Sequence, residues 1–591
     1  MDIIWHNSVT GRESCPVCAD GAAKRHVLDA MPTGAPGAAL SLRQCQACGC
    51  GYFADVLPPA YEAEPDDTTA LDFYLEQGAG VDVMAAPLAA IDPSTVNRYL
   101  EVGCGFGFSL DFARAAYGWQ VSGIDPGRNA RAGRDLLGLD IRSEYLTGDL
   151  PETERPDLIL CSEVLEHTER PDAFIGVLRK ALSSDGVLLL TTPNMEAACT
   201  GTPPGVLLPL LSPGHHLILY SPRGLEMLLR RGGFESVAIE TRGATLVACA
   251  AGPGRTPDLR RGFDRGLYRS YLARRCADID GATPLGIGLR ARHVKELVNV
   301  GAFEPAAAAA ADLRTAWVRG WASDPAAPAA VMAEEAPPED LAAYHRRAPF
   351  CAASALYHLG MLAWQHAGDL VAARSCFEAA ARTGERLRLL LRRIGSDDGE
   401  TDHLVWRARS NLVRLAAWTA PDTAPALAEA FAGACGPLLK EPVPAALVHE
   451  TLSEVFVTLV NKGRYEPAER LWARVPVVPE DRSGPTDASV SFVRGILCLN
   501  ARHTPSDAAG HFACAHRISR RLVEGGGGTD TPLIWEALYH QALAWVVAGD
   551  AKQASSAMAD LMSLPGRNGL PPLGQSEETR ARALARTHNL L

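Results

Sequence analysis

Three titratable side chains follow a short apolar run in the segment 158-LILCSEVLEH-167: Glu163, Glu166 and His167. Polar groups at the end of a buried strand cost free energy unless each has a partner. An imidazole has a pKa near neutrality and can take a proton from a hydroxyl group. Carboxylates and imidazoles together can also hold a divalent cation, which lowers the pKa of a coordinated hydroxyl. The segment therefore indicates acid–base or metal-assisted chemistry.

A second pair of imidazoles, His215 and His216, precedes another apolar run in 213-PGHHLILYSPRGL-225. With His167 they are the candidate general bases. If the two segments meet in the fold, the imidazoles would lie close to Glu166.

Two C-x-x-C pairs, Cys15 with Cys18 and Cys45 with Cys48, begin the chain. Four thiolates brought together by a small hairpin bind Zn²⁺ tetrahedrally, so residues 1–58 are expected to form a zinc-ribbon-like module with a structural Zn²⁺. Cys50 is a spare sulfur that could replace Cys48. Unrelated or redox-active pairs are the alternative, but a thioredoxin-like pair would open a helix after a strand, and neither does.

A strand, a glycine-rich loop, a helix and a second strand follow one another from residue 97, and the second strand ends at Asp125. Glycines in the loop 103-GCGFG-107 let the backbone approach a ligand at the start of the helix. An acidic residue at the end of the second strand can accept hydrogen bonds from both hydroxyls of a ribose.

Further strands and helices alternate after this unit, and the last two strands form a pair. A third strand is expected to lead to 147-TGDLP-151. The other strands are expected at 156–163, 185–194, 236–242 and 244–250, and helices at 172–182 and 221–234. This order predicts an α/β fold with a doubly wound, mostly parallel sheet and one antiparallel edge.

Residues 59–252 resemble the class I S-adenosylmethionine-dependent methyltransferases. The resemblance is carried by five motifs in the family's order: the segment Glu101–Gly107, Asp125, the segment 148-GDL-150, Glu166-His167 and the strand end Thr192–Asn194. It implies a seven-stranded sheet with S-adenosyl-L-methionine as cofactor. A nicotinamide-binding loop is the structural alternative, but the third glycine at the dinucleotide spacing is missing, since Ser109 and Leu110 lie there.

The resemblance also implies the cofactor contacts. Gly103 and Gly105, within the motif that begins at Glu101 and ends at Gly107, would pass the methionine part of the cofactor, and Asp125 would hold the ribose. The other expected contacts are Asp149 and Leu150 at the adenine and Cys161 beside the cofactor. Tyr74 and Gln77, which precede the loop, would either close over the cofactor or pack on the sheet.

The spacing Glu-x-x-Glu-His with a later histidine is similar to the metal site of small-RNA 2′-O-methyltransferases and of ubiquinone-pathway O-methyltransferases. By that resemblance Mg²⁺ or Mn²⁺ would be held by Glu163, Glu166, His167 and His216. Alternatively, Glu166 and His167 orient the cofactor loop without a metal, and His216 acts as a base or orients the acceptor. In either case the expected catalytic residues are His216, His167 and Glu166.

Residues 253–591 are rich in alanine, leucine and arginine with helical periodicity, and predict an all-α, solenoid-like domain. Four segments repeat one pattern, an apolar helix that ends at glycine followed by a second helix: 297–310, 362–380, 459–472 and 543–558. They resemble divergent tetratricopeptide repeats. Such a domain would bind a protein partner, or alternatively cover the catalytic domain or form a dimer.

Composition limits the function further. The net charge of −12 makes nucleic acid an unlikely partner, and the apolar fraction of 47% is that of a globular protein. The N-terminus shows no signal-peptide pattern and no segment could span a membrane, so a cytoplasmic location is expected.

The sequence favours methylation of a hydroxyl on a sugar, glycan or related metabolite. The alternatives are methylation of a deoxysugar carbon, a non-catalytic interaction protein and, less favoured, RNA 2′-O-methylation.

Overall fold

The computed structural model describes residues 2–31, 39–53, 56, 68–77, 81–148, 150–253, 259, 262–334, 336–525, 532–566 and 570–590. The chain forms two compact units, Met1–Val405 and Trp406–Leu591. The sequence predicts three domains with a boundary at 252/253, and that position lies inside the first compact unit.

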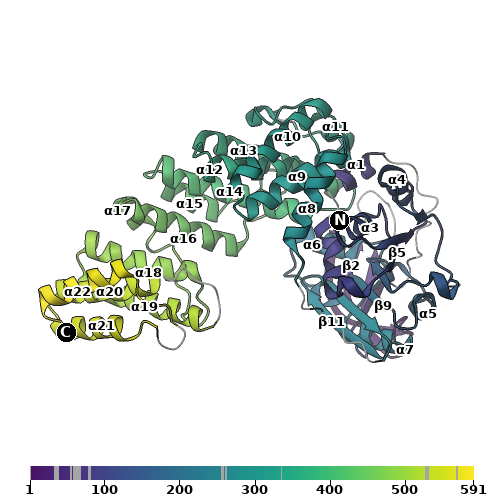
Figure 1. The fold of residues 1–591 in the computed structure, drawn as a ribbon, viewed down its shortest axis with the longest axis horizontal. Helices are drawn as coiled ribbons and strands as arrows, with labels where there is room; N and C mark the ends of the chain where they lie inside the picture. The colour runs from purple at the N-terminus through teal and green to yellow at the C-terminus, as the bar shows by residue number, and fades with distance from the viewer. Residues whose placement is uncertain are drawn as a thin grey trace. The chain divides into compact units, whose positions relative to one another are not determined.

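A seven-stranded sheet forms the centre of the first unit (Figure 1). Its strands, in spatial order, are β11 (Ser236–Arg242), β12 (Thr245–Ala251), β9 (Val187–Pro193), β8 (Leu158–Ser162), β5 (Arg98–Val102), β6 (Gln120–Ile124) and β7 (Ile141–Arg142). Strands β9, β8, β5, β6 and β7 run parallel, whereas β12 is antiparallel to both β9 and β11. The predicted doubly wound sheet with an antiparallel edge is confirmed.

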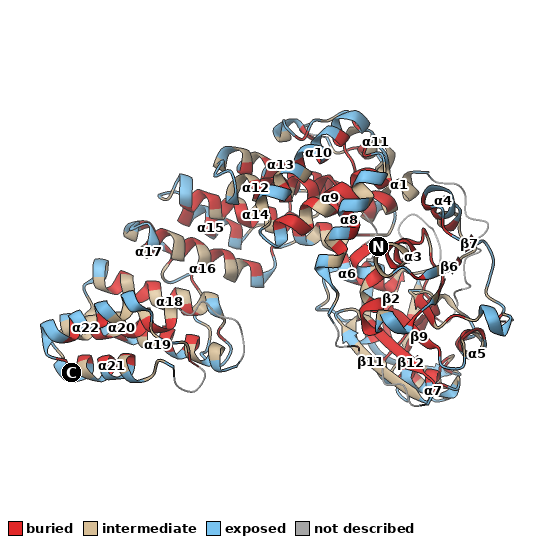
Figure 2. Ribbon diagram, in the orientation of Figure 1, coloured by how far each residue is buried: buried red, intermediate tan, exposed pale blue. Residues whose placement is uncertain are grey.

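Helices cover both faces of this sheet. The segment after β5 forms α3 (Phe108–Tyr117), and the later ones form α4 (Arg128–Leu137), α5 (Pro171–Ala181), α6 (Pro204–Leu211) and α7 (Pro222–Arg231). All seven residues of β9 are buried, which is expected for a central strand packed on two sides. Figure 2 shows this burial along β9 and β12.

The N-terminal residues form a second, antiparallel sheet. Its strands are β1 (Asp2–Arg12), β2 (Ala23–Met31), β3 (Leu40–Gln44), β4 (Gly51–Phe53) and β10 (Ile218–Leu219). Strand β10 follows His216 directly, and it pairs with β4 through Ile218 opposite Tyr52. The cysteine-bearing segment is therefore joined by main-chain hydrogen bonds to the segment that carries the later histidines.

Helices from beyond residue 253 also belong to the first unit. They are α8 (Arg265–Asp278), α9 (Pro284–Asn299), α10 (Phe303–Gly320), α11 (Leu341–Arg347), α12 (Ala352–Gln365) and α13 (Leu370–Arg393), and they pack near α1 (Thr68–Glu76) and α2 (Val81–Ala85). Helix α9 contacts α1 closely: a Cβ on Gly288 would lie 2.5 Å from the Leu75 carbonyl oxygen. Asp111 of α3 accepts hydrogen bonds from Tyr271 and Arg275 of α8.

The second unit is helical throughout the part of it that the structure describes. After α14 (Gly399–Thr419), in which the unit boundary falls, come α15 (Ala424–Ala432), α16 (Ala445–Asn461), α17 (Tyr465–Leu471), α18 (Pro485–Leu497), α19 (Pro505–Glu524), α20 (Pro532–Ala548), α21 (Ala551–Ser563) and α22 (Gln575–His588). A π-helical turn, η9 (Cys498–Arg502), follows α18. Short 3₁₀ helices elsewhere in the chain are η3 (Ala86–Ala90), η4 (Pro93–Thr95), η5 (Glu152–Glu154), η6 (Leu165–His167), η7 (Met195–Ala197) and η8 (Pro328–Ala330).

The four predicted repeat segments each contain two helices separated by a glycine turn. The turn glycines Gly301, Gly368, Gly463 and Gly549 all have φ between 65° and 77°. This left-handed conformation is strained for any residue with a Cβ, so glycine ends the first helix of each pair. The large helical region is thereby confirmed, and its relation to tetratricopeptide repeats stays a prediction. None of the described helices has the length and apolar character needed to cross a bilayer.

Candidate functional site

A cavity of about 300 Å³ opens at the carboxyl ends of β5, β6 and β8. Ligands of open α/β sheets bind at this edge. The residues that line it are Val102, Gly103, Ile124, Asp125, Pro126, Glu144, Tyr145, Leu146, Glu163, Val164, His167, Thr168 and Phe174. Two predicted cofactor residues, Gly103 and Asp125, are among them.

The glycine loop is close-packed against its neighbours. Gly103 has φ of 73°, and a Cβ there would lie 2.2 Å from Val164 Cγ2. Gly105 has φ of 51°, and a Cβ there would lie 3.2 Å from the Tyr74 hydroxyl oxygen. Both positions therefore favour glycine. Tyr74 packs against the hydrophobic core with its hydroxyl beside Gly105, and its closing over the cofactor stays a prediction.

Asp125, directly after β6, is bound to the loops on either side of it. Its Oδ2 accepts a hydrogen bond from the Gly105 amide at 2.8 Å, and its Oδ1 accepts one from the Gly127 amide at 2.7 Å. Each carboxylate oxygen retains a further acceptor position. The side chain is thus held rigidly at the cavity wall with capacity to accept hydroxyl groups.

Glu101 lies at the end of β5, beneath the loop, and is 4% exposed. Its Oε2 has no hydrogen-bond partner among the described residues. Burial raises the pKa of this carboxyl well above its usual range. A buried acceptor without a partner is costly and indicates a ligand that supplies a donor.

The other predicted cofactor residues lie in different surroundings. Gly107 precedes α3 with φ of 84°, and Leu150 packs at the edge of the hydrophobic core. Cys161 is fully buried in β8, within that core, and does not line the cavity. Asp149 lies outside the described residues.

Sequence reasoning missed several residues of the cavity wall, among them Glu144, Tyr145, Leu146 and Phe174. The first three follow the short third strand, β7. The sequence could have indicated these three residues, because ligands bind just beyond the carboxyl ends of parallel strands.

Glu166, His167 and His216 form a cluster beside this cavity. Each offers one ligand atom, and these atoms all lie within 4.8 Å of one another. Glu166 and His216 are buried, and Glu166 Oε2 accepts a hydrogen bond from Thr192 Oγ1 at 3.0 Å. Its Oε1 has no hydrogen-bond partner in the described part of the chain. The fold thus brings together three of the four predicted metal ligands, all three of them also predicted catalytic residues.

The two imidazoles of the cluster are oriented by main-chain carbonyls. His167 Nδ1 donates to the His215 oxygen at 2.9 Å, and His216 Nδ1 donates to the Leu210 oxygen at 2.8 Å. In a neutral ring the lone pair then resides on Nε2, the atom that binds a metal or takes a proton. Burial lowers the pKa of His167 and lowers that of His216 to about 4. Both rings are therefore neutral near pH 7.

Glu163, the fourth predicted ligand, lies outside this cluster. It has φ of 54°, unusual for a residue with a side chain, and its Oε1 accepts a hydrogen bond from Thr191 Oγ1 at 2.9 Å. The side chain is exposed, but desolvation by the surrounding protein raises the pKa of its carboxyl. His215, the remaining candidate base, has an exposed side chain.

A second, larger cavity of about 760 Å³ shares Glu163 with the first. Its lining comprises Phe73, Gln77, Asp82, Val83, Glu163, Pro193, Gly205, Val206, Pro209, Leu210, Ala244, Thr245, Arg292, Lys295, Asp397, Asp398, Gly399 and Glu400. Gln77 lines this cavity and not the first one. Glu163 stands where the two cavities adjoin.

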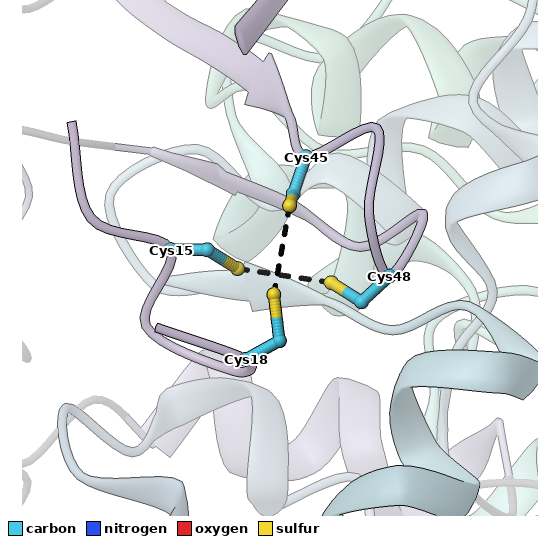
Figure 3. A group of neighbouring side chains, drawn as sticks. All are labelled: Cys15, Cys18, Cys45 and Cys48. Carbon is cyan, nitrogen blue, oxygen red and sulfur yellow. Dashed lines mark hydrogen bonds between the residues drawn. The ribbon is translucent and has the colours of Figure 1, made fainter. Parts of the chain in front are cut away.

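The four knuckle cysteines converge in the N-terminal sheet, as Figure 3 shows. The Cys15 and Cys48 sulfurs are 3.7 Å apart, and those of Cys18 and Cys45 are 3.6 Å apart. All four are free thiols. Cys50, the predicted substitute, instead accepts a hydrogen bond from the Ser221 amide at 3.4 Å.

The sulfur distances match a tetrahedral zinc site. Zn–S bonds of about 2.3 Å place tetrahedral sulfurs about 3.8 Å from one another. The pKa of Cys15 is raised because its thiol contacts Cys48 and is buried. Bound Zn²⁺ would reverse that shift by stabilising the thiolate.

Comparison with known proteins agrees with this geometry. Residues 74–239 match the family model described as a methyltransferase domain. Ubiquinone biosynthesis O-methyltransferases are similar over part of the chain. The protein from Glaesserella parasuis is 32% identical over 112 residues, which cover 17% of this chain and 47% of that protein. The protein from Pseudomonas entomophila is 29% identical over 156 residues, which cover 23% and 64%.

Thus the chain spans about half to two thirds of the length of these relatives. A solved O-methyltransferase family protein from Burkholderia thailandensis aligns with 32% of this chain and 59% of its own, at 16% identity and a TM-score of 0.25. By the family match and the curated relatives, residues 74–239 are similar to S-adenosylmethionine-dependent methyltransferase domains.

Proposed function

We propose that this protein transfers the methyl group of S-adenosylmethionine to a hydroxyl oxygen of a sugar, a glycan or a related metabolite. The observation that carries the proposal is the junction at Glu163. A cofactor-sized cavity and a larger cavity adjoin there, beside the buried cluster of Glu166, His167 and His216. A donor in one cavity and an acceptor in the other would meet at this junction.

S-adenosylmethionine would provide hydrogen-bond partners for the polar groups at the first cavity. The ammonium group of its methionine part would supply the donor that Glu101 Oε2 lacks. The ribose hydroxyls would donate to Asp125, and the adenine would pack against Tyr145 and Leu146. The Tyr74 hydroxyl lies beside Gly105 of the glycine loop.

Methyl transfer from a sulfonium is an in-line displacement, in which the carbon–sulfur bond breaks as the carbon–oxygen bond forms. The acceptor hydroxyl loses its proton, and a neutral imidazole can take it. His216 has the suitable tautomer, since its Nδ1 is bound to the Leu210 carbonyl. His167 and Glu166 would orient the acceptor oxygen.

The same cluster fits a divalent cation. One unpaired carboxylate oxygen and two oriented imidazoles form a ligand set in which Glu166, His167 and His216 would hold the ion. The nitrogen ligands suit Mn²⁺ better than Mg²⁺, which prefers oxygen. When bound, such an ion lowers the pKa of a coordinated hydroxyl.

Oxygen as the methylated atom is supported by the relatives, whose names specify O-methyltransferases.

The knuckle cysteines Cys15, Cys18, Cys45 and Cys48 are proposed to hold a structural Zn²⁺ with no part in the reaction, because four thiolates leave no position open for a substrate.

The test measures binding and transfer separately. Calorimetry of the full chain is expected to show binding of S-adenosylmethionine, and labelled donor is expected to transfer methyl to a hydroxyl acceptor. Replacing His216 by alanine is expected to abolish transfer while binding persists. A wild-type chain that does not bind the cofactor would refute the proposal.

A further inference from the structure

The larger cavity is built by two parts of the chain that are far apart in sequence. One wall comes from the methyltransferase domain, through Glu163 and helix α6. The opposite wall comes from helix α9 and from residues 397–400, which precede and begin α14. Every residue of this lining lies in the first compact unit.

Two glycines join these walls by a close approach of the backbones. A Cβ on Gly205, in α6, would lie 3.2 Å from the Gly399 Cα. A Cβ on Gly399 would lie 3.0 Å from the Gly205 carbonyl oxygen. A Cβ at either position would require α6 and the start of α14 to move apart by a few tenths of an ångström. The helical segment is therefore fitted to the methyltransferase domain at this cavity.

The wall from the helical segment is polar and oriented by its own contacts. Glu400 accepts from Lys295 Nζ at 2.9 Å, and its other oxygen lies 3.1 Å from Arg292. Gln77 donates to Asp398 at 3.2 Å, and Arg292 donates to the Gln77 carbonyl. Donors and acceptors thus alternate along one side of the cavity.

Lys295 retains donor capacity toward the cavity. Its ammonium has three hydrogens, and one of them binds Glu400. No further partner of Lys295 occurs among the described residues. A ligand hydroxyl could accept there and donate to a neighbouring carboxylate.

The facing wall is apolar. It contains Val206, Pro209 and Leu210 of α6 and Pro193 at the end of β9. The Leu210 carbonyl is also the acceptor that orients His216. This wall therefore connects the cavity directly to the reactive cluster.

The balance of charge in the lining disfavours anions. Five carboxylates line the cavity, but Asp82 pairs with Arg265, and Asp397 pairs with Arg388 and Arg392, which lie outside the lining. The carboxylates of Glu163, Asp398 and Glu400 then remain against the cations Arg292 and Lys295, a slight negative balance. A phosphorylated acceptor would meet like charge in a confined space. A hydroxyl group, in contrast, both donates and accepts, and suits a wall in which both kinds of group alternate.

We infer that the helical segment supplies the acceptor-recognition wall, and that the acceptor is an uncharged, hydroxyl-rich molecule. Its hydroxyl edge lies on Lys295, Asp398 and Glu400, and its C–H face packs on α6. The inference rests on the proposed function. A volume of about 760 Å³ suits a molecule of one or a few sugar rings, within the usual range of small-molecule sites.

The acceptor class is tested with labelled S-adenosylmethionine and three probes: methyl glycosides of hexoses and deoxyhexoses, UDP-glucose, and catechol. Label is expected in one or more glycosides, and at least tenfold less in the other two probes. Label only in UDP-glucose or catechol overturns the inference. So does a chain that binds the cofactor but methylates none of the glycosides.

The recognition wall is tested with two variants of the full chain. Lys295→Met is expected to raise the KM for the glycoside at least tenfold, with Lys295→Arg restoring most of the loss. Val206→Trp, at a residue 37% exposed, is expected to fill the cavity and abolish transfer. Both variants should retain the wild-type Kd for the cofactor, which shows that they are folded.

Matched controls carry comparable substitutions at exposed residues that do not line the cavity. Arg319→Leu breaks the exposed ion pair with Asp280, and Val371→Trp changes a valine that is 81% exposed. Both should behave as wild type. An unchanged KM in Lys295→Met together with full transfer by Val206→Trp overturns the recognition wall. Loss of cofactor binding in the wild type would instead refute the proposed function.

Discussion

The rings of His167 and His216 lie with their centroids 4.9 Å apart and their planes at 73°. His167 donates its Nδ1 hydrogen to the His215 carbonyl in the loop that follows α6, and His216 donates its own to the Leu210 carbonyl near the end of α6. Both Nε2 atoms are thereby available to the same small volume near Glu166. His167 and His216, which are 49 positions apart in the chain, thus lie in one cluster.

His216→Ala is expected to lower the rate of methyl transfer by about 100-fold or more, because the proton acceptor or metal ligand is lost. The Kd for S-adenosylmethionine should remain within about twofold, since His216 does not line the cofactor cavity. Single-turnover kinetics and calorimetry measure the two quantities.

His215→Ala is the matched control, because the exposed neighbouring ring is removed while the carbonyl that binds His167 stays. This variant should keep wild-type rates. Equal losses in both variants would assign the effect to the loop and not to His216.

Asp125→Ala is expected to raise the cofactor Kd by about tenfold to 100-fold, because hydrogen bonds to a charged group contribute about 1.5–3 kcal/mol. The substitution also frees the Gly105 and Gly127 amides from their shared acceptor. Asp135→Ala, on the exposed side of α4, is the control. Calorimetry that gives equal affinity for wild type and Asp125→Ala would remove Asp125 from the cofactor site.

Elemental analysis of the purified chain is expected to find one Zn²⁺ per molecule, and Cys18→Ser should lose it. The melting temperature should fall with the metal, because zinc binding contributes directly to folding. Methyl transfer should fall as well, since β4 of the cysteine-bearing sheet pairs with β10, next to His216. Cys199→Ser, at an exposed cysteine outside the cluster, should change none of these. A metal-free wild type with the same melting temperature would contradict the zinc site.

The buried pair of Glu76 and His345 predicts a pH dependence of stability. Burial raises the pKa of Glu76 to about 7 from its usual 4.5, against the opposing effect of His345. Burial lowers the pKa of His345, but the hydrogen bond to Glu76 and the negative charges of Glu76 and Asp72 together outweigh this and raise it. Both shifts mean that the folded chain binds protons more tightly than the unfolded chain. The pair therefore destabilises the fold progressively as the pH rises from about 4.5 to 7, and by about 3 kcal/mol for Glu76 alone.

Glu76→Gln should flatten this dependence, because the group no longer titrates. Thermal unfolding between pH 5 and 8 measures the effect, with Glu304→Gln on the exposed start of α10 as the control. A melting temperature that falls equally with pH in wild type and Glu76→Gln would show that another group is responsible.

Local patterns were sufficient to predict much of this fold. Strand and helix order predicted the doubly wound sheet with its antiparallel edge, because apolar periodicity and glycine positions depend on near neighbours in the chain. The turn glycines Gly301 and Gly463 were recognisable for the same reason, since only glycine adopts their backbone conformation without strain. The spacing of Cys15 and Cys18 likewise predicted one half of the four-cysteine cluster that the structure contains.

Contacts between distant segments could not be read in this way. The sequence alone placed Glu163 with Glu166 as a ligand and Cys161 beside the cofactor. The structure turns Glu163 toward the junction of two cavities and buries Cys161 in the core. A positive φ at Glu163 redirects its side chain, and no local pattern indicates it.

The sequence by itself determined the elements, the glycine loop and the identities of the reactive side chains. Only the tertiary structure decided that Lys295 and Glu400 share a cavity with Glu163, and that Gly205 meets Gly399. Hydrophobic periodicity specifies which face of a helix is buried, but not which helix covers it. That choice depends on the packing of surfaces separated by more than 100 residues.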